Sequence, residues 1–121
     1  MTPPVAQESL AGDVFRIAPE GRLDAVTVPA VEAVLNEHVE AGHSRLVIDL
    51  SGVTYVSSSG LRALLSARRR ARAGGGDVVL CGMQPRVREI FEMVGFVSLF
   101  KIVASVEEAA GTFTNGVSPQ A

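Results

Sequence analysis

Two short, almost continuously apolar segments constrain the fold of this chain more than any other feature. They are "RLVIDL", from Arg45 to Leu50, and "DVVLCGM", from Asp77 to Met83, and a segment with helical spacing lies between them. Such apolar runs are typical of strands in a sheet that helices cover on both faces. A helix between two strands returns the chain to the same end of the sheet, so we expect this pair to be parallel.

Turn residues and apolar spacing predict the remaining elements. Thr27, Pro29 and Gly42 mark the cap, the first turn and the end of one helix. Pro85 and Gly95 mark the start and the end of another. The alternation of the two kinds of element predicts an α/β domain. The predicted strands cover residues 5–10, 13–18, 45–50, 77–83 and 100–105, and the predicted helices cover residues 27–42, 58–73, 84–95 and 105–111.

Length and charge limit the range of functions. A chain of 121 residues is long enough for one domain and too short for two. The domain is predicted to cover residues 1–110, and residues 111–121 are expected to form a flexible tail. The net charge of −2 argues against nucleic acid or an anionic membrane as the main partner. Neither a signal peptide nor a membrane span is evident, so we expect a cytoplasmic protein.

Cysteine and histidine give no indication of a disulfide, a metal site or a cofactor. Cys81 is the single cysteine and lies in an apolar strand, so it is predicted to be a small buried side chain. His38 and His43 fall at the end of a predicted helix, and together with Cys81 they lack the spacing of metal ligands. We therefore expect neither a metal nor a cofactor.

Three consecutive serines precede the helix that is predicted from residue 58 onward. The segment "VSSSG" contains Ser57, Ser58 and Ser59 and lies where a sheet gives way to a helix, a place where α/β proteins often form sites. A serine at a helix N-cap accepts a hydrogen bond from an amide of the first turn. The spacing predicts that Ser58 or Ser59 is this cap, with Gly60 and Leu61 in the first turn. Two serines are then left without a structural task.

A nucleophile and a phosphate acceptor are the two functional alternatives for these serines. The nucleophile elbow of hydrolases, G-x-S-x-G, needs a glycine two residues before the serine, and Val56 occupies that position for Ser58. Both histidines, the candidate general bases, precede the serines in a segment that looks solvated. A phosphate, in contrast, is favoured at a helix N-terminus by the free amides and the helix dipole. No enzymatic activity is therefore expected.

Four segments in order resemble a known family. They are "EGRLDA" (20–25), "LVIDLSGVTYVSSSGLRALL" (46–65), "GGGDVVLCGM" (74–83) and "VREIFEMVGF" (87–96). Their order and spacing resemble the STAS domain, and more narrowly the bacterial anti-sigma-factor antagonists. The resemblance implies a single STAS domain with a mixed β-sheet of four to five strands flanked by about four helices. It also implies a protein that acts by binding, which we expect to be a monomer.

The resemblance also implies partners and site residues. Such antagonists, when unphosphorylated, capture an anti-sigma factor that is also a serine kinase, and so release a sigma factor for transcription. Phosphorylation of one serine ends the capture, and a metal-dependent serine phosphatase restores it. Ser58 matches the acceptor, with Ser57 and Ser59 as alternatives. The predicted partner-binding residues are Asp24, Ser57, Ser59, Gly60, Leu61 and Arg62.

One departure from the family pattern leaves a second function open. Ser57 stands where many members carry aspartate. This exchange removes a negative charge beside the acceptor and adds a competing hydroxyl. The alternative to a phosphorylation switch is a constitutive STAS scaffold, either a stressosome-like component or an accessory subunit of a lipid transporter.

Overall fold

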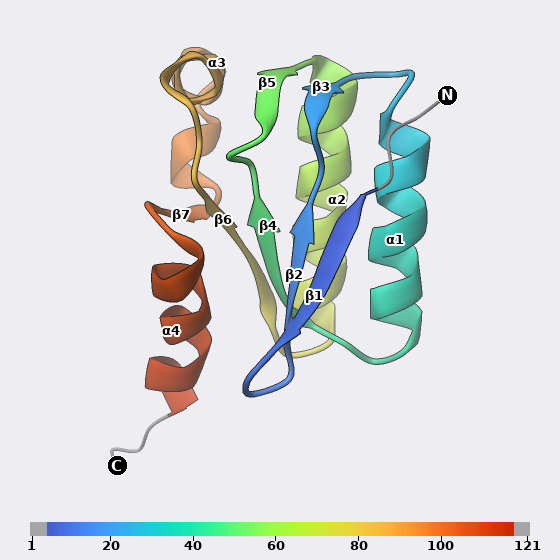
Figure 1. Ribbon diagram of the computed structural model, residues 1–121, viewed down its shortest axis with the longest axis vertical. Helices are drawn as coiled ribbons and strands as arrows, with labels where there is room; N and C mark the ends of the chain where they lie inside the picture. Colours follow the sequence, from blue (N-terminus) through green and yellow to red (C-terminus); the bar gives the residue numbers. More distant parts are fainter. Residues whose placement is uncertain (1–4, 118–121) are drawn as a thin grey trace.

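A mixed, five-stranded sheet forms the centre of the domain. The computed structural model describes residues 5–117, and Figure 1 shows the sheet with helices on either side. The strand order is β1-β2-β4-β6-β7; β1 pairs antiparallel with β2, and the other neighbours are parallel. The predicted mixed α/β fold is thus confirmed. The strands are β1 (Ala6–Leu10), β2 (Val14–Ala18), β4 (Arg45–Asp49), β6 (Asp77–Cys81) and β7 (Lys101–Val103).

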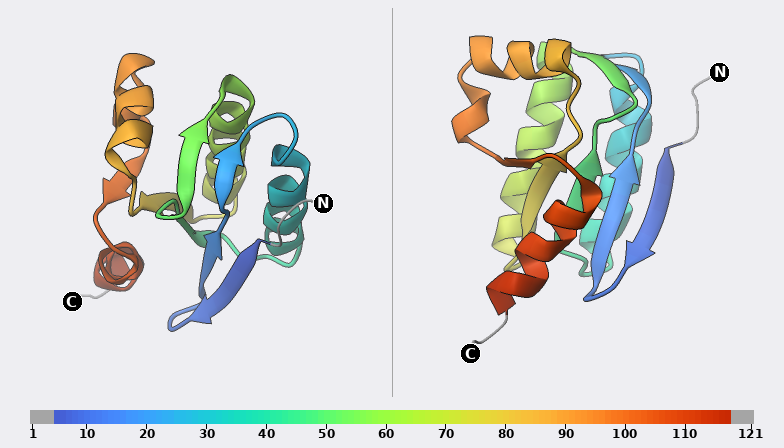
Figure 2. Two further views of the ribbon diagram at one scale, coloured as in Figure 1. Left: turned by 45° about the horizontal axis from the view of Figure 1, so that its top comes forward. Right: turned by 60° about the vertical axis from the view of Figure 1, so that its left-hand side comes forward.

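Helices cover both faces of this sheet. Helices α1 and α2 lie side by side against one face, and α4 packs on the opposite face (Figures 1 and 2). Helix α3 lies at the end of the sheet near β5 and is followed by a short 3₁₀ turn. Every helix of the described chain was predicted from the sequence. Their bounds are α1 (Val28–Glu40), α2 (Ser58–Ala73), α3 (Pro85–Met93) and α4 (Val106–Val117), and the 3₁₀ turn is Phe96–Ser98.

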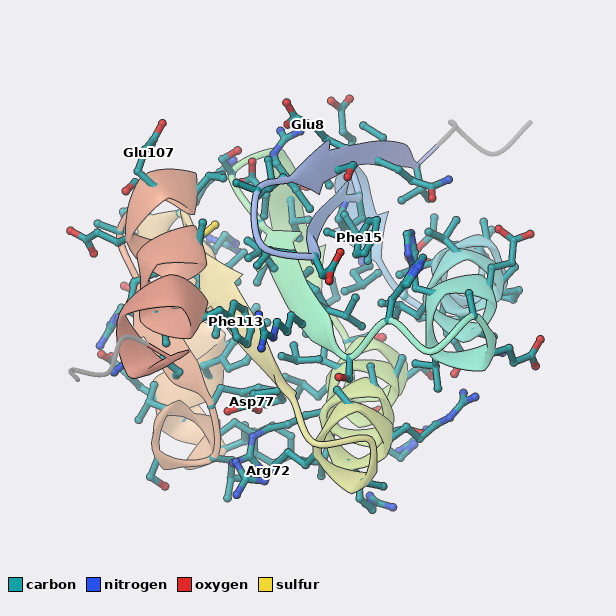
Figure 3. All side chains as sticks on the ribbon, turned by 90° about the horizontal axis from the view of Figure 1, so that it is seen from below. Glu8, Phe15, Arg72, Asp77, Glu107 and Phe113 are labelled. Carbon is teal, nitrogen blue, oxygen red and sulfur yellow. The ribbon has the colours of Figure 1, made fainter. Side chains whose placement is uncertain are left out.

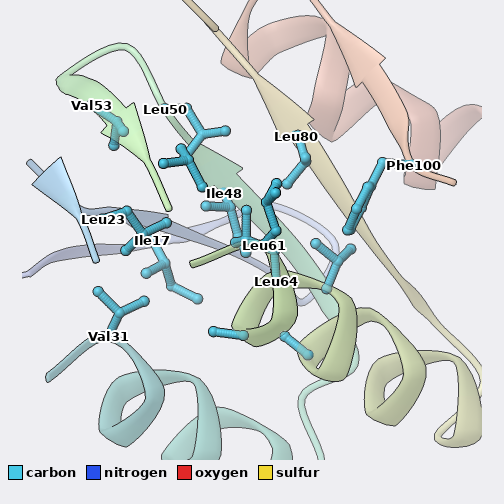
Figure 4. Close-up of a cluster of buried hydrophobic side chains, with 14 of the residues drawn as sticks. Ile17, Leu23, Val31, Ile48, Leu50, Val53, Leu61, Leu64, Leu80 and Phe100 are labelled. Carbon is cyan, nitrogen blue, oxygen red and sulfur yellow. The ribbon is translucent and has the colours of Figure 1, made fainter. Parts of the chain in front are cut away.

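Strand alternation explains why the sheet has two apolar faces. Along β4, Leu46 and Ile48 belong to the larger core, which faces α1 and α2, whereas Val47 belongs to the smaller core beneath α4. Figure 4 shows the larger core, where Leu64 of α2 meets the sheet. Cys81 is fully buried in the smaller core, as predicted, and its burial raises the pKa of its thiol to about 12.

The C-terminal helix is longer than the sequence predicted. Ser105 caps α4, because its Oγ accepts the Glu108 N–H at 3.1 Å, which confirms the predicted start. The helix continues to Val117, however, and Phe113 packs against the smaller core (Figure 3). Residues 111–117 are therefore helical and are not the flexible tail that was predicted. Residues 118–121 lie outside the described part of the chain.

Two short strands were not predicted at all. β3 (Gly21–Leu23) and β5 (Val53–Val56) form a separate, parallel two-stranded sheet. They follow directly on β2 and β4, and Figure 1 shows them beyond the carboxyl ends of those strands. At three and four residues, they are too short for a clear pattern of alternating apolar residues. This small sheet holds the two loops that contain Asp24 and the three serines.

Candidate functional site

The small sheet brings the serine loop against the loop that contains Asp24. Leu23 pairs with Val56 at the ends of β3 and β5, and the chain enters α1 after one strand and α2 after the other. The Ser57 N–H donates to the Leu23 carbonyl at 2.9 Å. The two loops, which are more than 30 residues apart in the sequence, are therefore neighbours at one end of the domain (top of Figure 1).

Gly60 permits this close approach. A Cβ atom at this position would lie 2.6 Å from the Leu23 carbonyl oxygen and 2.9 Å from Val56 Cγ1. The first of these contacts is with backbone that is already held by the hydrogen bond from Ser57. Only a residue without a side chain fits between α2 and the end of β3.

The three serines occupy three different environments. Ser57, and not Ser58 or Ser59 as predicted, is the N-cap of α2: its Oγ accepts the Gly60 N–H at 3.3 Å. The cap is one residue earlier because Ser57 has extended backbone angles and its own N–H is bonded to Leu23. Ser58, the first helical residue, is exposed, and Ser59 is half-buried. Ser58 thus presents its hydroxyl to solvent beside the free amides of a helix N-terminus.

Asp24 organises its own loop. Its Oδ1 accepts the N–H groups of Val26 at 3.1 Å and Thr27 at 3.3 Å, and Thr27 Oγ1 accepts the Asp24 N–H at 3.0 Å. Burial by itself raises the pKa of the Asp24 carboxyl, but these hydrogen bonds and the nearby Arg22 outweigh it and lower the pKa overall. Asp24 is therefore ionised at neutral pH, and its charge lies next to the serine loop.

The surroundings of these loops combine charge with apolar surface. The Arg22 guanidinium lies 4.3 Å from the centre of the Tyr55 ring and contacts Asp24 at 3.3 Å. Val26, at the tip of the Asp24 loop, has 77% of its surface exposed. Nothing in the sequence singles out this valine, because isolated apolar residues in loops are common. We call the surface formed by Arg22, Asp24, Val26, Ser58 and Arg62 the serine-loop face.

Two predicted partner-binding residues support this face from beneath. Leu61 is only 6% exposed and packs in the larger core, so the prediction that it contacts a partner is wrong (Figure 4). Gly60 is buried as well and shapes the loop. Arg62 is exposed, as a partner-contacting residue must be, and lies one helical turn after Ser58.

The rest of the basic segment of α2 takes part in the fold. Arg68 and Arg72, near the end of the helix, each lie 3.4 Å from a carboxylate oxygen of Asp77 at the start of β6. Figure 3 shows Arg72 beside Asp77. These arginines are at the end of α2 opposite to the serines, so they do not contribute to the serine-loop face.

The structure offers no support for a catalytic serine. His38 and His43 lie at the C-terminal end of α1, whereas the serine loop is next to its N-terminal end (Figure 1). Neither imidazole is therefore placed to take a proton from Ser58. Among residues 5–117, no group of three or more histidine, cysteine, aspartate or glutamate side chains is arranged to hold a metal ion. No helix in that range is long and apolar enough to span a membrane.

Comparison with known proteins identifies the family. The STAS-domain profile matches residues 9–109. BtrV of Bordetella bronchiseptica, which is named as an anti-sigma factor antagonist, is 39% identical over 94 residues, or 78% of this chain and 81% of BtrV. The anti-sigma-B factor antagonist of Staphylococcus aureus is 25% identical and is matched over 77% of this chain and 86% of its own. The chain belongs to the STAS-domain family, and the relatives that it matches are anti-sigma factor antagonists.

Solved structures share the fold. An anti-sigma factor antagonist from Mycobacterium paratuberculosis superposes with a TM-score of 0.80 at 25% identity, covering 93% of this chain and 97% of its own. Unphosphorylated SpoIIAA superposes with a TM-score of 0.79 at 22% identity, covering 92% and 96%. The phosphorylated form of SpoIIAA from Bacillus gives a TM-score of 0.71 at 22% identity, covering 90% and 98%. The architecture described above is therefore that of a STAS domain.

Proposed function

We propose that this protein is an anti-sigma-factor antagonist that is switched by phosphorylation of Ser58. In its unphosphorylated form it binds an anti-sigma factor that is also a serine kinase, and the serine-loop face is the surface of contact. Transfer of a phosphoryl group to the Ser58 hydroxyl weakens this complex. A metal-dependent serine phosphatase removes the group and restores binding. The protein acts as a cytoplasmic monomer and has no catalytic activity of its own.

The different environments of the three serines are the observation that carries this proposal. The Ser57 hydroxyl is engaged as the helix cap, and Ser59 is half-buried. Ser58 is exposed at the first position of α2, where a kinase can approach it. Ser57 replaces the aspartate that many family members carry at this position. A serine can cap a helix as an aspartate does, so the exchange leaves the N-cap of α2 in place.

Electrostatics explains why a phosphate at this position acts as a switch. The phosphoryl group adds nearly two negative charges to a surface that already includes the ionised Asp24. An interface fitted to the small hydroxyl of Ser58 would have to enclose and desolvate this charge. The free amides at the start of α2 tolerate the phosphate within the domain itself, so the fold is expected to be preserved.

Phosphorylation by the cognate kinase tests the proposal. The tag-free protein is incubated with ATP and the serine kinase of the anti-sigma type from its source organism, and the modified residue is identified by mass spectrometry. We expect phosphate on Ser58, none on the S58A variant, and normal phosphorylation of S57A. The S58D variant is expected to bind the kinase at least tenfold more weakly than the unphosphorylated wild type does, a difference of about 1.4 kcal/mol. Phosphate on Ser57 would contradict the assignment, and binding without any phosphorylation would favour the constitutive scaffold.

The charge of Asp24 can be tested separately from its role in the loop. D24N keeps an oxygen that accepts the N–H groups of Val26 and Thr27, but it lacks the negative charge. We expect D24N to melt like the wild type and to bind the kinase more weakly. D24A, which loses both features, is the matched comparison and should melt at a lower temperature. If D24N binds with unchanged affinity, Asp24 has a structural role only.

A further inference from the structure

His38 and His43, five residues apart in the sequence, lie against each other at the end of the domain opposite to the serine-loop face. His38 lies in the last turn of α1, and His43 follows that helix in the loop before β4. Their Nδ1 atoms are 3.1 Å apart. The spacing of five residues is not a typical ligand spacing on a helix, and only the turn at Gly42, with a φ of +87°, brings the two rings together.

Neighbouring side chains hold both rings in place. The His38 Nε2 atom lies 3.0 Å from Gln7 Oε1 on β1, and an amide oxygen only accepts, so Nε2 carries the proton. His38 Nδ1 then has a free lone pair, which the His43 Nδ1–H approaches. The His43 ring stacks on Phe15 with ring centres 4.0 Å apart and planes inclined by 15°. Figure 3 shows Phe15 of β2 on the side of α1.

The local electrostatics favours the neutral form of His38. Burial lowers the pKa of His38, the proximity of His43 lowers it further, and Glu37 acts in the opposite direction. An open pocket lined by His43, together with the oppositely charged Asp13 and Arg45, gives solvent access to the His43 side of the pair. The Nδ1 atoms of the two rings face each other at this place, and solvent in the pocket can supply further ligands.

We propose that His38 and His43 chelate a divalent transition-metal ion through their Nδ1 atoms, with zinc as the probe ion. Zinc–nitrogen bonds are about 2.05 Å long, so two of them to nitrogens 3.1 Å apart enclose an angle of about 100° at the metal. This angle lies between the square-planar and tetrahedral values. The ion takes the place of the proton between the two rings. His43 loses the proton from Nδ1 and takes one up at Nε2, so it stays a neutral imidazole and no net proton is released.

The arrangement around His38 has the features of a metal ligand. Histidine ligands usually donate their second ring N–H to an oxygen, which fixes the tautomer, and Gln7 fulfils this role here. Two protein ligands with water completing the coordination give weaker binding than the three or four protein ligands of established zinc sites. Cu²⁺, which forms the most stable complexes in the series of divalent first-row ions, is expected to bind more tightly than zinc.

Metal binding at this site would stabilise the domain without involving the serine-loop face. The ion would tie the end of α1 to the loop before β4, and the supporting residues Gln7 and Phe15 connect this pair to β1 and β2. Because the metal binds the folded state, the melting temperature should rise with the metal concentration. The inference is independent of the proposed phosphorylation of Ser58, because Ser58 begins α2 at the opposite end of the domain.

Calorimetric titration of the tag-free protein with zinc chloride tests the proposal. At about pH 7.5 we expect one ion per chain, and weaker binding at about pH 5.5, because protons compete with the metal for the ring nitrogens. H38Q and H43Q should each weaken binding at least tenfold, whereas S44A, next to His43, should bind like the wild type. Circular dichroism of each variant in the presence of a chelator checks the fold.

Nuclear magnetic resonance of the wild type provides a test that needs no variant. Zinc should shift the ring signals of both histidines together, in proportion to occupancy. The absence of binding at about 1 mM zinc would overturn the proposal and leave a shared proton as the only link between the rings. Zinc that shifts one ring alone, or that binds H38Q or H43Q with wild-type affinity, would also overturn it.

Discussion

Replacement of Gly60 by alanine tests how closely α2 approaches the end of β3. The new Cβ would lie 2.6 Å from the Leu23 carbonyl oxygen, a distance at which the backbone has to move. Overpacking costs about 1–3 kcal/mol, and because the clash here is with backbone, the upper part of that range applies, about 2–3 kcal/mol. Alanine recovers up to about 1 kcal/mol through its higher helix propensity. The net expectation for G60A is a loss of about 1–2 kcal/mol in the free energy of unfolding, and with it a displaced serine loop.

Urea unfolding, followed by circular dichroism, measures this loss. The matched control is G52A, at the opposite end of β5, whose Cβ would lie 3.2 Å from the exposed Glu20 side chain and at an ordinary contact distance of 3.6 Å from the Pro19 carbonyl oxygen. That side chain can move aside, so G52A should differ from the wild type by less than about 0.5 kcal/mol. G60A should also be a poorer substrate for the kinase, since the loop that presents Ser58 shifts. Equal stability of G60A and the wild type would show that the close approach does not constrain the fold.

Two further predictions concern the caps and the pH dependence of stability. S57A should lower the free energy of unfolding by about 1 kcal/mol, because the Gly60 N–H loses its acceptor. S58A should change this free energy by less than about 0.5 kcal/mol. Thermal melting compares the two variants, and a larger effect of S58A than of S57A would contradict the cap assignment. Burial raises the pKa of the Asp49 carboxyl, but hydrogen bonds from Ser51 and Arg16 outweigh it and lower the pKa overall. Since the folded pKa is below the unfolded value near 4, Asp49 stabilises the fold above about pH 4, and this contribution is lost as the pH falls through the folded pKa. D49N keeps the hydrogen bond from Ser51 but loses the ion pair with Arg16 at 2.9 Å. It should be about 1–3 kcal/mol less stable than the wild type at pH 7 and should lose less stability on acidification. An acid-unfolding profile like that of the wild type would refute the contribution of the Asp49 charge.

Elements with a repeated local signal were predictable from the sequence. The apolar runs of β4 and β6 identified the centre of the sheet, and the proline and glycine positions around α1 and α3 gave their limits to within a few residues. These features depend on the backbone preferences and side-chain spacing of neighbouring residues, so they can be read without knowledge of distant contacts. The resemblance to STAS domains rested on the same local segments.

The features that define the candidate site depend on contacts between distant segments. Ser57 became the helix cap because its N–H bonds to Leu23, more than 30 residues earlier, and Leu61 is buried because α2 packs on the sheet. In the same way, the strands β3 and β5 persist through their mutual pairing and not through their own composition.

The histidine pair and the end of α4 show the same limit. The sequence alone placed His38 and His43 on a solvated segment, and only the packing of α1 beside β1 and β2 brings Gln7 and Phe15 to them. The helix α4 extends past residue 111 because Phe113 gains an apolar surface on the sheet. Local sequence thus determined the α-helices and the strands of the main sheet. The free energy of long-range packing and hydrogen bonding decided whether β3 and β5 form and which side chains are exposed, paired or buried.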